Sequence, residues 1–80
     1  MRAGTGVDGR QAALGGRLLR LRTAAGLGAG EVADAAGLDR AFYGEVETGA
    51  FARNGLTYLD VLRLAEVLDV PPAALLADPD

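Results

Sequence analysis

The 80-residue sequence contains no cysteine, no histidine and no lysine. Without cysteine the chain can form no disulfide framework and offers no thiol nucleophile, and without histidine it lacks an imidazole base and the usual nitrogen ligands of zinc. It also has no apolar run long enough to cross a bilayer and no apolar signal segment near its start. These absences predict a cytoplasmic protein without thiol, imidazole or zinc chemistry.

Positive charge is scarce and unevenly placed. Eight arginines oppose eleven acidic residues, which gives a net charge of -3. This balance argues against a domain that coats nucleic acid or anionic lipid indiscriminately, although a local basic patch can still bind specifically. Residues 1–22 hold five arginines against Asp8 alone, and residues 1–13 carry several glycines before any apolar period begins. We therefore predict a flexible, arginine-bearing N-terminal arm over residues 1–13.

Apolar residues at helical spacing predict three helices in the first half of the chain. The first helix begins near residue 14 and ends at Gly26, the second covers residues 29–36 and ends at Gly37, and the third covers residues 40–47, between a capping Asp39 and Gly49. The residues expected to face inward are Leu14, Leu18, Leu21, Ala25, Val32, Ala33, Ala36, Tyr43 and Val46.

Two further helices are predicted after residue 56. Thr57 and Asp60 have the spacing of a capping box, and Pro72 suits the first position of a short final helix. No segment alternates with period two, so we expect no strand. The predicted fold class is all-α, a five-helix domain over residues 14–77 followed by an acidic tail at residues 78–80. The apolar stripes expected of the last two helices are Tyr58, Val61, Leu62, Ala65 and Leu68, then Leu75 and Leu76.

No motif supports catalysis or a cofactor. Glycines 4, 6 and 9 have the spacing of a dinucleotide-binding loop, but that loop needs a preceding strand, for which there is no room. Glu45 and Glu47 lie two residues apart on a helix and so point in different directions, which excludes an acid and base pair. Asp78 and Asp80 supply too few ligands for a metal site. We therefore expect no enzymatic activity, no cofactor and no metal.

The strongest pattern is the pair of short helices around Gly37. Small residues at Ala33 and Gly37 allow a close, steep crossing of two helices, which is the geometry of a helix-turn-helix. With Tyr43 packed inward, the third helix presents its outer face where a DNA-reading helix carries its contacts. The outward residues predicted there are Arg40, Ala41, Gly44 and Glu45.

Three segments carry a resemblance to a known family. They read LLRLRTAAGL, EVADAAGLDRAFYGEVETG and RNGLTYLDVLRLAEVLDV. Together, over about residues 15–77, they resemble the Cro and phage-repressor type of helix-turn-helix regulator, the XRE-like family, and LDRAFY and RNGLTY look like its restriction-modification controllers. The resemblance implies a sequence-specific transcriptional regulator that binds operator DNA as a homodimer. It also implies an ion pair between Arg22 and Glu47 that links the first and third helices.

The chain departs from this family at both DNA-facing helices. Gly28 and Ala29 stand where the family usually has Ser and a phosphate-binding Gln, and Gly44 and Glu45 stand where it often has Ser followed by a basic residue. Glu45 repels phosphate unless it accepts from a cytosine amino group. The DNA-contacting residues that the resemblance implies are Arg17, Ala29, Asp39, Arg40, Ala41, Phe42, Gly44, Glu45, Arg53 and Asn54.

Several of these assignments have a structural alternative. Arg40, the main candidate base reader, could instead pair with Asp39 or Asp34, and Phe42 could pack on the core rather than touch a thymine methyl. Leu75 and Leu76 suit a dimer interface but could only cover the bundle. The departures and the net charge also favour a second hypothesis, in which the helix-turn-helix serves as an adaptor for a protein partner with weak or no DNA binding.

Overall fold

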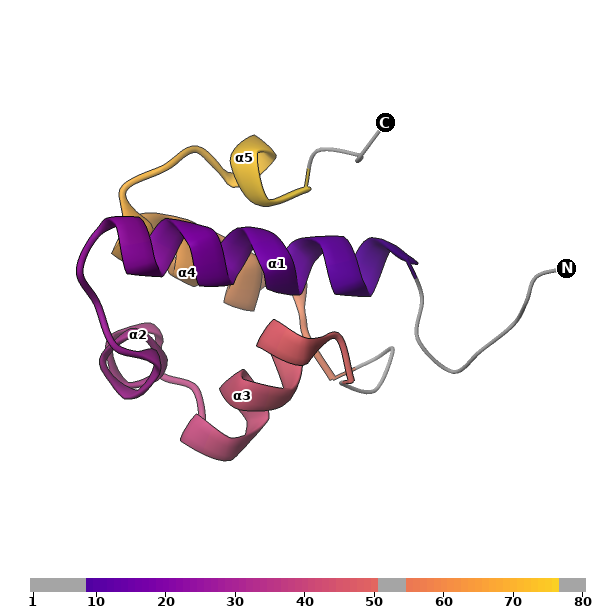
Figure 1. Ribbon diagram of the computed structural model, residues 1–80, viewed down its shortest axis with the longest axis horizontal. Coiled ribbons are helices and arrows are strands. Elements are labelled where there is room, and N and C mark those ends of the chain that lie inside the picture. Colours follow the sequence, from indigo (N-terminus) through magenta and orange to yellow (C-terminus); the bar gives the residue numbers. More distant parts are fainter. Residues whose placement is uncertain (1–8, 51–54, 77–80) are drawn as a thin grey trace, which may run out of the picture.

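The computed structural model of the protein describes residues 9–50 and 55–76, and within these ranges the chain forms five helices and no strand (Figure 1). The all-α, five-helix prediction is therefore confirmed. None of these helices is both long enough and apolar enough to cross a membrane. The elements are α1 (Gly9–Ala24), α2 (Ala29–Ala36), α3 (Arg40–Thr48), α4 (Tyr58–Leu68) and α5 (Pro72–Leu76).

The longest helix, α1, runs through the middle of the domain, and α3 and α5 lie on opposite sides of it (Figure 1). α1 packs against both of them, α2 packs against α3 and α4, and α4 packs against α5. The core between them is apolar. Its fully or almost fully buried residues are Leu14, Leu18, Val32, Ala33, Ala36, Tyr43, Val46, Val61, Leu64, Ala65, Leu68 and Leu75.

Local sequence signals set the helix ends. Gly37 ends α2 and Gly49 ends α3, both with a positive φ, of 76° and 77°, which a glycine adopts without strain. At the start of α4 the Thr57 hydroxyl accepts the Asp60 N–H at 3.1 Å, and the Asp60 carboxylate accepts the Thr57 N–H at 3.1 Å. The predicted capping box is therefore present.

Two sequence expectations about the helices need correction. α1 begins at Gly9 rather than near residue 14, because its first turns pack on the end of α3, where Ala12 lies against Gly49. In α4 the predicted stripe is right at Val61, Ala65 and Leu68, which are buried, but it omits one core residue and includes one exposed residue. Leu64 is fully buried, whereas Tyr58 is 63% exposed, since it is the first residue of the helix and lies beyond the core.

Candidate nucleic-acid interface

α2, the turn at Gly37 and α3 form the predicted helix-turn-helix, and α3 presents one face to solvent. Asp39 caps α3 by accepting the Phe42 N–H at 3.0 Å. Tyr43 and Val46 are fully buried on the inner face. The opposite face carries exposed Ala41, Gly44 and Glu45, and the space beyond the Gly44 backbone is open. This exposed face is the candidate interface.

A close backbone contact between α1 and α3 fixes where this face lies. A Cβ on Gly15 would come 2.3 Å from the carbonyl oxygen of Glu47 and 2.5 Å from that of Val46. No side chain fits at such distances, so α1 reaches the C-terminal turn of α3 only because residue 15 is glycine. The only sign of this requirement in the sequence is the pair of adjacent glycines, Gly15 and Gly16, inside a helix.

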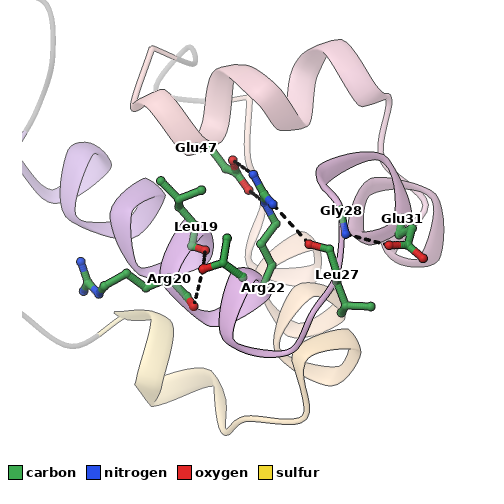
Figure 2. Close-up of polar contacts among 8 residues, drawn as sticks. Leu19, Arg20, Arg22, Leu27, Gly28, Glu31 and Glu47 are labelled. Carbon is green, nitrogen blue, oxygen red and sulfur yellow. Dashed lines mark hydrogen bonds and ion pairs between the residues drawn. The ribbon is translucent and has the colours of Figure 1, made fainter.

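An ion pair then ties the same two helices together (Figure 2). Arg22 donates through Nε to Glu47 Oε2 at 2.5 Å and through Nη2 to Oε1 at 3.1 Å. Its Nη1 donates to the Leu27 carbonyl at 3.2 Å, which holds the connection between α1 and α2. The two side chains are only 17% and 11% exposed. One arginine therefore positions both helices of the helix-turn-helix relative to α1.

The titration of Glu47 reflects this environment. Burial alone would raise the pKa of its carboxyl, but the hydrogen bonds and the charge of Arg22 hold it below the usual 4.5. Burial, and then the Glu47 charge, raise the pKa of Tyr43 well above its usual 10. Its hydroxyl is buried without a hydrogen-bond partner among the described residues. The site thus keeps Glu47 ionised and Tyr43 neutral at neutral pH.

Arg40, the candidate base reader, lies at the first position of α3 and pairs with Asp34 of α2. Its Nε donates to Asp34 Oδ1 at 3.1 Å and its Nη2 to Oδ2 at 2.5 Å. The hydrogen bond to Asp34 raises the pKa of Arg40, and the same bond lowers the pKa of Asp34. Both side chains remain largely exposed, so the pair adds little stability.

The exposed charges of α2 and α3 are predominantly negative. In the part of these helices that the structure describes, Arg40 is the one exposed guanidinium. It is accompanied by four exposed carboxylates, those of Glu31, Asp34, Asp39 and Glu45. The backbone N–H of Gly28, at the N-terminus of α2, is not available to a phosphate either, because it donates to the Glu31 carboxylate at 2.7 Å (Figure 2). Nonspecific attraction to phosphate is therefore weak on this face.

Four of the residues predicted for the interface have other roles or other neighbours in the structure. Arg17 donates from Nη1 to the Leu75 carbonyl at 2.9 Å, so it fastens α5 on the side of α1 away from α3, and its DNA contact stays a prediction. Leu75 is fully buried inside its own domain and cannot form a dimer surface, whereas Leu76 is 47% exposed. Phe42 and Ala29 are half-buried against the core. Arg53 and Asn54 lie outside the described residues.

Comparison with known proteins agrees with this geometry. Residues 13–77 match the helix-turn-helix domain family. The structure of the restriction-modification controller protein C.AhdI from Aeromonas hydrophila is 38% identical, with a TM-score of 0.73, over 81% of this chain and 94% of that one. No curated protein matches the chain.

Two further solved structures share the fold at lower identity. The hypothetical transcription factor NHTF from Neisseria is 22% identical, with a TM-score of 0.77, over 98% of this chain and 90% of that one. The N-terminal DNA binding domain of SinR from Bacillus subtilis is also 22% identical, with a TM-score of 0.74, over 85% and 96% of the two chains. At this identity they support the fold.

Proposed function

This chain belongs to the helix-turn-helix domain family, a type of DNA-binding transcription regulator, and from that premise we propose that it binds operator DNA as a homodimer. The observation that carries the proposal is the exposed outer face of α3, with the Arg40 guanidinium at its N-terminal end. A helix of this kind enters the major groove and contacts base edges through its first residues.

Sequence discrimination rather than nonspecific attraction is the expected source of affinity. The exposed carboxylates of α2 and α3 oppose phosphate, so affinity has to come from contacts that the correct base pairs make. Arginine donates two parallel hydrogen bonds to the O6 and N7 atoms of guanine, and one such contact gives about 1–3 kcal/mol of discrimination. Arg40 is the residue on this face able to make it, within the described ranges.

Selection from a random duplex library with the full chain tests this function. Fluorescence anisotropy at low salt then compares the selected duplex with a scrambled one, and we expect the selected duplex to bind at least about 10³-fold more tightly. Arg40→Ala should remove about 1–3 kcal/mol of that difference. Arg20→Ala is the matched control, because Arg20 lines a hollow with Ala74 between α1 and α5, away from α3. No enrichment of any duplex would contradict the function.

The proposed dimer contact is Leu76 at the end of α5. It is a large apolar side chain that is 47% exposed, and a self-complementary contact around a two-fold axis would bury it in both copies. Leu76→Asp should shift the chain to monomer in analytical ultracentrifugation. Leu19→Asp, which alters an equally apolar side chain that is 43% exposed on α1, should leave the dimer intact. A wild-type chain that sediments as a monomer at every concentration would contradict the contact.

The acidic outer face supports a second candidate, an adaptor that binds a basic protein segment. Glu45 is exposed on α3 next to the open surface at Gly44, which suits a cationic peptide as well as a cytosine amino group. Here Glu45→Lys distinguishes the two functions. It should strengthen duplex binding in a DNA reader, whereas in an adaptor it should abolish binding of a labelled arginine-rich peptide that the wild-type chain retains.

A further inference from the structure

The guanidinium of Arg40 packs on α2 against Asp34 and Gly30, and we call these two residues its seat. Asp34 accepts from its Nε and Nη2 atoms, at 3.1 and 2.5 Å. Its flat face lies over Gly30, where a Cβ would come 3.0 Å from Cζ, 3.1 Å from Nη1 and 3.2 Å from Nε. These three atoms are almost equally distant from one point, so the guanidinium lies flat over the position that any larger residue would fill.

This seat leaves the end of the guanidinium free. The contact with Asp34 uses the edge formed by Nε and Nη2, so both Nη1 hydrogens and one Nη2 hydrogen remain. No other acceptor bonds Arg40 within the described residues, and its side chain is 69% exposed. Two parallel N–H donors on that end match the O6 and N7 acceptors of guanine.

We propose that Asp34 and Gly30 are positioning residues that preorganise Arg40 to read a guanine edge in the major groove. This inference rests on the proposed function. A surface arginine without a partner samples many rotamers, and ordering it on binding reduces affinity about two- to twelvefold. Asp34 and Gly30 restrict the side chain before DNA arrives, so the correct site gains that factor. The wrong base leaves the free end of the guanidinium without an acceptor.

The ratio of the scrambled-duplex Kd to the selected-duplex Kd is the measurement that isolates this role. Asp34→Asn removes a negative charge and so strengthens binding to every duplex, but it should lower the ratio about two- to twelvefold. Glu66→Gln is the matched control, because it removes the same charge from an exposed position on α4, outside the candidate interface and without touching Arg40, and it should leave the ratio unchanged. Gly30→Ala should lower the ratio in the same direction but by less, with no change of charge, because the new Cβ moves the guanidinium by a few tenths of an ångström.

Arg40→Ala completes a double-mutant cycle with each of these substitutions. In that background Asp34→Asn and Gly30→Ala should have no further effect on the ratio. A wild-type ratio near one overturns the proposed function and this inference together. A high wild-type ratio that neither Asp34→Asn nor Gly30→Ala lowers, or that Glu66→Gln lowers equally, overturns the inference alone.

A second readout needs no DNA. In the free chain the Arg40 Nε–H should give a resolved signal in a ¹H–¹⁵N spectrum, because its exchange with water is slowed by the bond to Asp34. Asp34→Asn should remove that signal and Gly30→Ala should weaken or shift it, while the backbone spectrum and the thermal midpoint persist. A wild-type Nε–H that exchanges as fast as that of an unpartnered arginine overturns the seat.

Discussion

Replacing Gly15 with alanine tests whether the backbone contact between α1 and α3 places the candidate interface. The new Cβ would lie 2.3 Å and 2.5 Å from two carbonyl oxygens and 2.7 Å from the carbonyl carbon of Glu47. These are backbone atoms of a packed helix, so α3 has to move away from α1. Overpacking of this kind costs about 1–3 kcal/mol, and contacts with rigid backbone belong near the upper end.

A gain in helix propensity opposes this cost. Alanine is favoured over glycine inside a helix by about 1 kcal/mol, so Gly15→Ala should destabilise the fold by about 2 kcal/mol net. Gly16→Ala supplies the matched control, because its Cβ meets only the Arg20 side chain, at an unstrained 3.6 Å. That variant should gain about 1 kcal/mol. The two neighbouring substitutions are therefore expected to differ by about 3 kcal/mol.

Urea denaturation of both variants measures that difference directly. Thermal denaturation gives a second measure. Because 1 kcal/mol moves the thermal midpoint of a domain of this size by about 4–8 °C, the thermal midpoints of the two variants should be at least about 10 °C apart. Gly15→Ala should also weaken binding of the selected duplex, since moving α3 displaces its outer face. Equal stability of the two variants would refute the close contact and, with it, our account of how α3 is positioned.

Three further predictions follow from the charges and the open surface. Glu47 has a folded pKa below its unfolded value, so its contribution to stability is complete above about pH 5 and is lost as the pH falls through the folded pKa. Glu47→Gln should therefore be about 2 kcal/mol less stable than the wild type at pH 7. In urea denaturation between pH 7 and pH 3 it should also lose less stability than the wild type does. Gly44→Ala should raise the free energy of unfolding by about 0.5–1 kcal/mol, because the space around Gly44 is open; a destabilised variant would show that this space is occupied. The Kd of the selected duplex should depend weakly on salt, with a log–log slope of magnitude below about 4, since few phosphate contacts are available; a slope near 10 would contradict the described charges.

Local signals allowed the helix ends to be predicted from the sequence. Gly37 and Gly49 allow left-handed backbone, and Asp39 and Thr57 have short side chains that reach the amides of the first turn. Each signal acts within a few residues, so the sequence contains all the information it requires. The bounds of α2, Ala29–Ala36, agree with the prediction for that reason.

Features that depend on packing between helices could not be read in the same way. Tyr58 and Leu62 fit the helical spacing of Val61, Ala65 and Leu68, and only the docking of α4 on its neighbours selects Leu64 for the core and leaves Tyr58 exposed. The requirement for glycine at position 15 is likewise set by how closely α1 approaches α3. Periodicity finds a helix, but the direction of its buried face is a property of the assembled domain.

The partner of Arg40 shows how local and long-range effects combine. From the sequence alone Asp39 and Asp34 were equally plausible partners. In the structure the Asp39 carboxylate already accepts the Phe42 N–H as the cap of α3, whereas the Asp34 carboxylate lies across the turn on α2 and accepts from no group other than Arg40 among the described residues. The helix cap therefore determines which carboxylate is left for the arginine.

The acidic character of the interface and the seat of Arg40 have a common consequence. A face on which carboxylates outnumber guanidinium groups gains little from the phosphate backbone, so a duplex with the wrong sequence is held weakly. On such a face each base contact contributes a large share of the total affinity, and a loss of rotamer freedom at its arginine reduces that share directly. An arginine fixed before binding is therefore most valuable where electrostatic attraction is weakest, and α3 of this domain combines both conditions.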